Sequence, residues 1–357
     1  MRVAYTLEQC WHRVPGGTAI AALEVAKEMA SQSDVELVGI AGRHSRPPTS
    51  GYEPALRVAA LPIGGRLLYE MWTRTGWPKV ESVVHIDLVH STTVLPPATS
   101  LPLIATLHDI AFVRHPEFFT AHGNKIFRRS LNILKKKNAT ILCSSLATLD
   151  DCREEGFADE RLHHVPLGVR SHVVTESDIA RVRATYALPT EFVLFVGTQE
   201  PRKNLSRLVE ALATMGDAPP LVVVGMEGWG ETGIALSHDV RLTGHVPEHD
   251  LPALYAACSV FAFPSVLEGY GLPVVEAMAH GAPVVTSRGT STEEVAGGAA
   301  VLVDPLSIES IADGVRRGLH SRDELKVLGY ARAAEVPWSR TAELTADVYR
   351  SVMEGTQ

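Results

Sequence analysis

The chain has 357 residues, which at roughly 100–200 residues per domain indicates two domains, and its 45% hydrophobic and 21% charged residues are ordinary for a globular protein. These values exclude a disulfide-stapled miniprotein and a disordered chain. The formal net charge is −8, from 33 Lys and Arg against 41 Asp and Glu, which argues against a protein that binds nucleic acid through its phosphates.

Short apolar runs alternate with amphipathic stretches in the first half of the chain. The runs predict buried strands, and they cover residues 3–7, 35–41, 103–107 and 140–143. Between the first two runs, residues 19–30 carry apolar side chains at helical spacing, which predicts a helix packed on a sheet.

The second half repeats this scheme more sharply, with predicted strands at residues 192–196, 221–224, 260–263, 284–286 and 300–303. Alternation of apolar strands with helices predicts α/β domains, each a doubly wound parallel sheet covered on both faces. The seam is expected near residues 163–169, where Gly168 serves either as a hinge or as a turn glycine. We therefore expect domains at 1–169 and 170–337, with a last helix, 338–357, packing back on the first.

The most informative segment covers residues 263–279. A predicted strand ends at its first residue, a turn containing Gly269 and Gly271 follows, and Pro273 stands where the first helical turn accepts a residue without an N–H group. The backbone amides of Gly271 and Leu272 would then point out of the helix N-terminus and form a site for an anion such as a diphosphate. The two glycines let the backbone approach a ligand without a Cβ atom in the way.

Two glutamates flank this turn. Glu268 precedes it and Glu276 lies about one turn inside the helix, so both carboxylates can border one pocket and accept hydrogen bonds from sugar and ribose hydroxyls. Such a pair is common by chance and gains weight only from the strand, glycines and proline around it. The alternative is a plain strand–helix turn with two solvated carboxylates.

This segment resembles a known family signature. The sequence Glu-Gly-Tyr-Gly-Leu-Pro-Val-Val-Glu of residues 268–276 is similar to the Glu-x7-Glu signature of retaining glycosyltransferases of family 4, which have the GT-B fold. Further segments agree in chain order: the glycine loop after the first strand (15–17), the acceptor-domain histidine loop (106–109), the donor-phosphate loop (195–205) and the stretch that closes the donor domain (294–305). The resemblance covers nearly the whole chain and implies two Rossmann-like domains facing a cleft, the first for the acceptor and the second for a nucleotide-sugar donor.

The resemblance also implies roles for individual residues. Its donor-binding residues are Gly16, Gly17, Gly197, Arg202, Lys203, Glu268, Gly269, Tyr270, Gly271, Leu272 and Glu276. Its catalytic residues are His108, Arg202, Lys203 and Glu268. A lone histidine after a strand, such as His108, is more often structural, but the resemblance implies that it contacts the transferred hexose or stabilises charge through its backbone. A plain turn is the alternative for Gly16 and Gly17.

Two cations stand in the phosphate loop. Arg202 and Lys203 follow a strand that ends at Gly197 and precede a helix predicted near Leu205, which places them at the carboxyl edge of the second sheet. There they would stabilise the charge that grows on a departing diphosphate. Many relatives carry Arg directly after this glycine, whereas this chain has Thr198, and Arg202 is expected to take over that role. The alternative is two solvated surface cations.

Metal ligands are not evident in the sequence. It contains no Asp-x-Asp pair, with which the other large glycosyltransferase fold holds Mg²⁺ or Mn²⁺, and the adjacent His163 and His164 would point to opposite faces of a strand. We expect metal-independent transfer without a cofactor. The mechanism implied by the resemblance is attack of the acceptor hydroxyl on the face that the diphosphate leaves, with Glu268 binding sugar hydroxyls rather than acting as a nucleophile.

The expected activity is transfer of a hexose from a nucleotide-diphosphate sugar to a glycan or lipid-linked acceptor in polysaccharide or cell-envelope assembly. The Glu-Pro-Arg-Lys-Asn form of the phosphate loop resembles that of transferases in polysaccharide or glycolipid assembly, many of which use GDP-mannose, so the resemblance implies GDP-mannose as the donor. The alternative is a catalytically silent sugar-nucleotide-binding protein of the same fold that acts as a partner or sensor. A phosphorylase or epimerase of this fold is disfavoured by the segment around Glu268 and Glu276.

A basic segment, residues 125–137, lies on a helix predicted from about Gly123. Its charges are either the solvated side of that helix or a patch for an anionic membrane surface that receives lipid-linked acceptors. No apolar run approaches the ~20 residues of a membrane span, and residues 1–6 lack the pattern of a signal peptide. We expect a cytoplasmic protein, or one peripheral at the inner face of the membrane, with four free thiols because no Cys-x-x-Cys spacing occurs.

Overall fold

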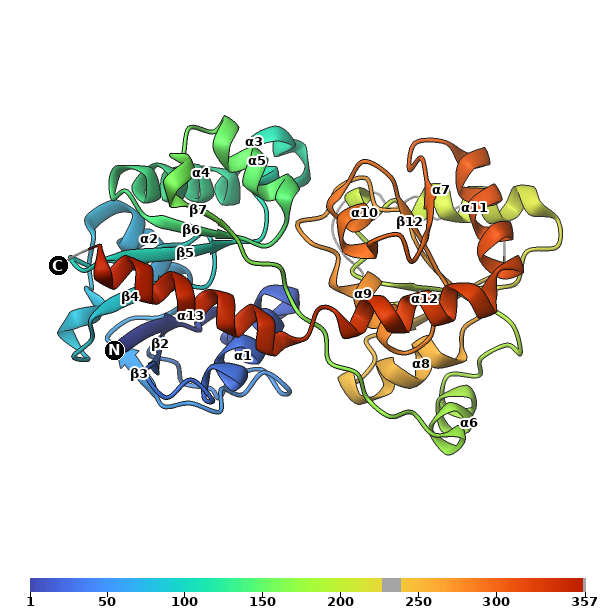
Figure 1. The fold of residues 1–357 in the computed structure, drawn as a ribbon, viewed down its shortest axis with the longest axis horizontal. Helices are drawn as coiled ribbons and strands as arrows, with labels where there is room; N and C mark the ends of the chain where they lie inside the picture. Colours follow the sequence, from blue (N-terminus) through green and yellow to red (C-terminus); the bar gives the residue numbers. More distant parts are fainter. Residues whose placement is uncertain (227–238, 356–357) are drawn as a thin grey trace. The chain divides into compact units, whose positions relative to one another are not determined.

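The computed structural model describes residues 1–226 and 239–355, which form two compact units (Figure 1). The first unit comprises Met1–Gly168 and Trp338–Gln357, and the second comprises Val169–Pro337. The division lies one residue before the boundary expected from the sequence.

The first unit contains a seven-stranded parallel sheet. Its strands are β1 Arg2–Thr6, β2 Glu36–Gly42, β3 Val58–Leu61, β4 Leu88–Ser91, β5 Leu103–Leu107, β6 Thr140–Cys143 and β7 Leu162–His164, in the spatial order β3-β2-β1-β4-β5-β6-β7. The central strands are buried on both faces, as a parallel sheet between helical layers requires.

Helices cover this sheet. They are α1 Gly16–Met29, α2 Gly65–Thr75, α3 Ala111–Arg114, α4 Ala121–Lys136, α5 Leu146–Glu154 and α13 Trp338–Glu354, with short 3-10 turns η1 Glu8–Trp11, η2 Val80–Ser82, η3 Pro116–Phe118 and η4 Asp159–Arg161. The C-terminal helix α13 packs on α1 (Figure 1). Two contacts hold it there: the Tyr349 hydroxyl lies 2.6 Å from His90 Nδ1, and Arg350 Nε donates to Asp34 at 2.8 Å.

The second unit contains a six-stranded parallel sheet. Its strands are β8 Val193–Val196, β9 Leu221–Val224, β10 Val240–Gly244, β11 Val260–Phe263, β12 Val284–Ser287 and β13 Val301–Val303, in the order β10-β9-β8-β11-β12-β13. Its helices are α6 Glu176–Thr185, α7 Leu205–Met215, α8 Leu251–Ala257, α9 Leu272–Ala279, α10 Ser291–Ala296, α11 Ile308–His320 and α12 Arg322–Ala334, with 3-10 turns η5 Pro201–Lys203 and η6 Glu248–Asp250.

The strand order fixes where this sheet binds a ligand. The chain proceeds outward from β8 through β9 to β10, then returns to place β11 on the other side of β8. The loops after β8 and β11 therefore diverge, and a crevice at such a reversal is the usual ligand site of an open α/β sheet. These two loops carry Arg202, Lys203 and Glu268.

Two further expectations concern the chain as a whole. Each of the four cysteines is buried and has a free thiol, as expected. Across residues 1–226 and 239–355, no helix combines the length and the apolar character needed to cross a bilayer.

Candidate active site

The loop after β8 begins at Gly197, a position that only glycine fits well. Gly197 has φ +153°, and a Cβ atom there would lie 3.0 Å from Lys203 Cδ. On its other side, a Cβ on Gly225 would lie 2.1 Å from the Gly197 carbonyl oxygen, so the loops after β8 and β9 meet backbone to backbone. The stem of Lys203 therefore lies directly against Gly197.

An ion-pair cluster joins this loop to the loop after β11. Lys203 Nζ lies 2.9 Å from Glu268 Oε1, and Arg202 Nη1 lies 2.9 Å from Glu268 Oε2. Arg202 Nε also pairs with Glu200 at 2.8 Å. The Lys203 and Glu268 side chains are only 10% and 9% exposed. Arg202 is 23% exposed and paired with two carboxylates, so the alternative of two solvated surface cations is wrong.

The cluster keeps Glu268 ionised. Burial alone would raise the pKa of this carboxyl, but Lys203 and then Arg202 outweigh burial and bring the pKa to about 2. The Lys203 ammonium is also 4.8 Å from the centroid of the Phe263 ring, at the end of β11. Two cations and the two carboxylates of Glu200 and Glu268 thus face one another at the sheet edge.

Helix α9 begins as the sequence predicts. Gly271 is its N-cap with φ +106°, Leu272 is its first residue, and Pro273 lies in the first turn. A Cβ on Gly271 would lie 2.7 Å from Thr292 Cγ2, so this position needs glycine for space as well as for conformation. Ser291 Oγ donates to the Glu268 carbonyl at 2.7 Å and fixes the turn before the helix. Gly269 and Tyr270, between these points, are buried.

The two signature glutamates have different partners. Glu268 contacts Arg202 and Lys203, whereas Glu276 accepts a hydrogen bond at Oε2 from the Tyr255 hydroxyl at 3.1 Å. Burial raises the pKa of Glu276 to about 7, although the Tyr255 hydrogen bond lowers it. One carboxylate is held ionised by cations, and the other titrates near neutrality. Sequence reasoning missed Tyr255, which lies 21 residues before Glu276 and outside the motif.

His108 lies in the first unit, directly after β5 as predicted. Its Nδ1 is 2.9 Å from Ser144 Oγ, and its carbonyl accepts a hydrogen bond from Thr148 Oγ1 at 2.9 Å. Burial lowers the pKa of His108 to about 4, although a hydrogen bond with the Thr92 backbone opposes this shift. The imidazole is therefore neutral at physiological pH. It also borders a cavity of about 20 Å³ that His90 shares.

The two glycines near the N-terminus have a different setting from the expected loop. Gly16 and Gly17 open helix α1, with Pro15 at the N-cap, instead of standing in a loop before it. Gly16 has φ +67°, and no atom lies within 4 Å of the position that its Cβ would take. Within its own unit, Gly16 is thus required by the backbone conformation rather than by a close contact.

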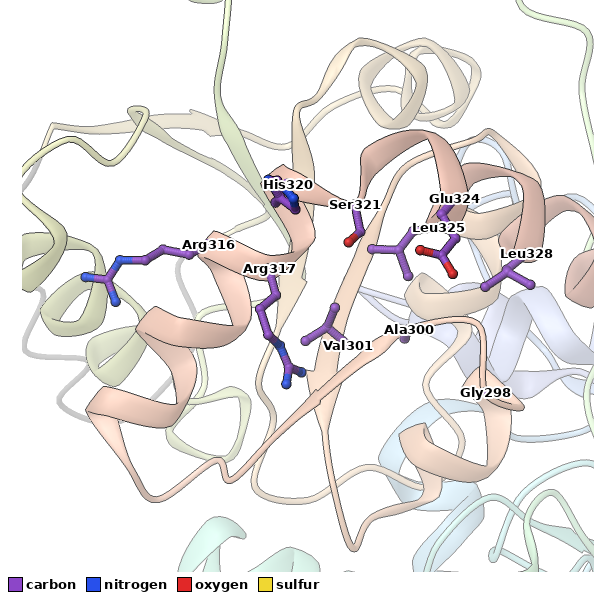
Figure 2. A pocket seen from close by; sticks show the side chains of 10 residues that line it. All are labelled: Gly298, Ala300, Val301, Arg316, Arg317, His320, Ser321, Glu324, Leu325 and Leu328. Atoms are coloured by element: carbon purple, nitrogen blue, oxygen red, sulfur yellow. The ribbon is translucent and has the colours of Figure 1, made fainter.

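A pocket of the second unit lies away from the predicted donor residues. This pocket, of about 480 Å³, opens beside β13, between α11 and α12 (Figure 2). Its walls include Val301, Arg317, His320 and Leu325, and none of the predicted donor residues lines it. In the part of the chain that the structure describes, no three His, Cys, Asp or Glu side chains group closely enough to hold a metal ion.

Comparison with known proteins matches a family model to each of the two units. The family model "Glycosyltransferase Family 4" matches residues 15–172, and the model "Glycosyl transferases group 1" matches residues 179–334. The chain is 29% identical to the O-antigen chain mannosyltransferase B of Escherichia coli over 265 residues, 69% of this chain and 70% of that protein. It is 30% identical to the MMP alpha-(1->4)-mannosyltransferase of Mycolicibacterium hassiacum over 277 residues, 71% of this chain and 66% of that protein.

A solved structure agrees with the fold. Anabaena HepE, solved in complex with UDP and glucose, superposes with a TM-score of 0.74 at 20% identity, over 98% of this chain and 100% of that one. The two family models meet near the division between the units, and their order along the chain is that of the two sheets. The chain therefore belongs to glycosyltransferase family 4 and is a glycosyltransferase of the GT-B fold.

Proposed function

We propose that this glycosyltransferase moves a hexose from a nucleotide-diphosphate sugar to a hydroxyl of a glycan or glycolipid acceptor, with retention at the anomeric carbon and without a metal ion. The observation that carries the proposal is the ion-pair cluster of Arg202, Lys203 and Glu268 at the strand-order reversal of the second sheet. A diphosphate leaving group needs positive charge at that edge, and two cations fixed in place meet that need without reorganisation.

The reaction follows from the chemistry of the two substrates. The acceptor oxygen bonds to the anomeric carbon while the bond from that carbon to the diphosphate breaks on the same face, and the acceptor proton passes to the departing phosphate oxygen. Arg202 and Lys203 stabilise the diphosphate as its charge grows. The N-terminus of α9, at Gly271 and Leu272, adds the positive end of its dipole.

Glu268 is proposed to bind sugar hydroxyls and not to attack the anomeric carbon. Each of its oxygens is paired with a cation, and a carboxylate with a pKa of about 2 is a weak nucleophile. Glu276 is proposed to accept hydrogen bonds from ribose hydroxyls. His108, neutral and held by Ser144, is proposed to contact the transferred hexose as a hydrogen-bonding group rather than as a cation.

The donor is proposed to be GDP-mannose. Support comes from the phosphate loop and from relatives whose names describe mannosyltransferases, one of them for an O-antigen chain. The test is a thermal-shift and hydrolysis screen of the purified protein against GDP-mannose and UDP-, ADP- and dTDP-sugars, with and without EDTA. GDP-mannose is expected to give the largest shift and slow hydrolysis that EDTA leaves unchanged. Binding without hydrolysis or transfer would support the silent sugar-nucleotide-binding protein instead, and no shift with any donor would refute the donor site.

We also propose peripheral membrane contact through residues 125–137, supported by the cations of this segment that are exposed. Several cations of this segment are used within the first unit: Arg128 donates to backbone carbonyls of α3, Arg129 contacts Glu70, and Lys135 contacts Glu155. Lys125 and Lys136 are exposed. Flotation with vesicles tests the proposal: binding that grows with anionic lipid would support it, and no dependence on anionic lipid would remove it.

A further inference from the structure

The structure shows a buried arrangement around Glu276 that the family signature does not contain. We propose that Tyr255 is a positioning residue that holds the Glu276 carboxylate in place for the nucleotide-sugar donor, and that His280 holds Tyr255. This inference rests on the proposed function, in which Glu276 accepts a hydrogen bond from the ribose. It adds to that function the group that orients the carboxylate.

The Tyr255 hydroxyl donates a hydrogen bond to one specific oxygen of the Glu276 carboxylate. Tyr255 lies on α8, is 1% exposed, and donates to Glu276 Oε2 at 3.1 Å. Its ring packs edge-on against Phe261 of β11, with centroids 5.4 Å apart. A buried tyrosine whose ring is fixed in this way holds its hydroxyl at one point, which leaves Oε1 as the oxygen assigned to the ligand.

Tyr255 is also one end of a stack of three rings. The His280 ring lies parallel to Tyr255 with centroids 6.1 Å apart, and the His172 ring lies parallel to His280 with centroids 6.0 Å apart. His280 directly follows α9, and His172 lies just after the start of the second unit. The stack thus brings α8, the end of α9 and His172 together.

Hydrogen bonds determine the protonation state of His280. Its Nδ1 must donate, because its partner at 2.7 Å is the carbonyl oxygen of Glu276. Its Nε2 must accept, because its partner at 3.2 Å is the backbone N–H of His172. The neutral Nδ1–H tautomer satisfies both bonds. The same histidine therefore fixes the backbone of Glu276 while its ring supports the tyrosine that holds the Glu276 side chain.

The titratable groups around Glu276 come from several elements. They are Tyr255 on α8, His280 and His172 in the stack, and Glu248 on η6. Lys326 and Tyr330 of α12, which also packs on α9, lie instead at Gly281, beyond the end of that helix. Glu248 raises the pKa of Glu276 and Tyr255 lowers it, after the larger effect of burial. The Tyr255 hydroxyl favours the ionised carboxylate, so removing it should raise the pKa of Glu276. A loss of packing alone would not shift this pKa in a defined direction.

The test is the pH dependence of donor binding in Tyr255→Phe. Dissociation constants for GDP-mannose and UDP-glucose are measured by calorimetry from about pH 5.5 to about pH 9, a range centred on the titration of Glu276. In the wild type, affinity should fall as the pH drops through about 7 and Glu276 becomes protonated. In Tyr255→Phe, the inflection should move to higher pH by about half a unit or more. At the alkaline end, where Glu276 is ionised but no longer held, affinity should stay about two- to tenfold below wild type.

Two variants serve as controls. Glu276→Gln should abolish the inflection, and adding Tyr255→Phe to it should have little further effect. Tyr186→Phe removes another hydroxyl–carboxylate bond in the same unit, from Tyr186 to Asp250 at 2.6 Å, and should leave the inflection in place.

The outcomes separate this inference from the function on which it rests. An unshifted inflection in Tyr255→Phe, or a uniform loss of affinity at every pH, would overturn the positioning role. If the wild type binds neither nucleotide sugar, the proposed donor site itself is wrong. A wild type that binds without an inflection, matching Glu276→Gln, would show that Glu276 does not meet the donor and would overturn the inference as well.

Discussion

Lys203 Nζ and Glu268 Oε1 lie 2.9 Å apart in a buried ion pair between two loops that are 65 residues apart in the chain. The pair joins the loop after β8 to the loop after β11, on the two sides of the strand-order reversal. Arg202 completes it from the same 3-10 turn, at 2.9 Å from the other carboxylate oxygen. The cations that are proposed to hold the diphosphate are therefore placed by the first carboxylate of the Glu-x7-Glu sequence.

Replacing Lys203 with Met should affect stability and activity together. The substitution keeps the apolar stem against Gly197 and removes the charge, which leaves Glu268 with Arg202 as its cation. We expect the free energy of unfolding to fall by about 1–3 kcal/mol, less than for a buried charge left without any partner, because Arg202 still pairs with Glu268. The rate of transfer should fall by about 100-fold or more, as when one preorganised donor is removed. Chemical denaturation and steady-state kinetics measure the two effects.

The matched control for this variant is Lys326→Met, an exposed lysine on α12 of the same unit. It should change the free energy of unfolding and the activation free energy of transfer by no more than about 0.5 kcal/mol each, because exposed substitutions away from special features rarely have larger effects. Equal effects in the two variants would show that the buried pair has no special role.

Glu268→Gln should impair transfer without abolishing it. The amide can still hydrogen-bond a sugar hydroxyl and one cation, but it no longer neutralises the cations. A covalent mechanism would instead require the carboxylate itself. Residual transfer at about 0.1–10% of the wild-type rate is expected, in line with the loss of one electrostatic contact. Mass spectrometry of the enzyme quenched during turnover should find no glycosyl adduct on Glu268; such an adduct would show that it is the nucleophile.

The same carboxylate should make the second unit sensitive to acid. The pKa of Glu268 is about 2 in the folded protein and ordinarily near 4.5. Its stabilising contribution is therefore complete above the ordinary value and is lost as the pH falls toward the folded value. Wild type should lose about 2 kcal/mol more than Glu268→Gln between pH 6 and about pH 3. Denaturation of both proteins across this range measures the difference, and parallel curves would contradict the ion-pair geometry.

The sequence predicts most of the interior strands, because a parallel sheet buries them on both faces and most are runs of apolar residues. The expected ranges coincide with β5, β6, β9 and β11. The edge strands β3 and β10 were not predicted, because most of their residues are half-buried or exposed; Leu242 of β10 is 54% exposed. The interior strand β4 was also missed although it is buried, because two of its four residues are His90 and Ser91 and it forms no apolar run. A run of apolar side chains, rather than burial or strand propensity, is what the sequence pattern reports.

The site was predicted residue by residue but not as a set of contacts. The motif placed Glu268, Arg202 and Lys203 at one sheet edge, with the cations assigned to phosphate and the carboxylate to sugar. Their mutual pairing depends on which loops the strand order brings together, and a local pattern does not contain that information. The same holds for Tyr255, which reaches Glu276 only because α8 packs against α9.

Gly271→Ala should disrupt the start of α9 for two separable reasons. The backbone at φ +106° is strained for an alanine, and the new Cβ would lie 2.7 Å from Thr292 Cγ2. Gly289→Ala is the matched control, because Gly289 has φ +72° but open space where its Cβ would lie. The control should lose about 1–2 kcal/mol from strain alone, and Gly271→Ala should lose about 1–3 kcal/mol more because of the clash. Only Gly271→Ala should also weaken binding of the nucleotide sugar, since it moves the amides that are proposed to face the diphosphate. Denaturation and calorimetry of the two variants test this, and equal donor affinities would show that the N-terminus of α9 does not contact the donor.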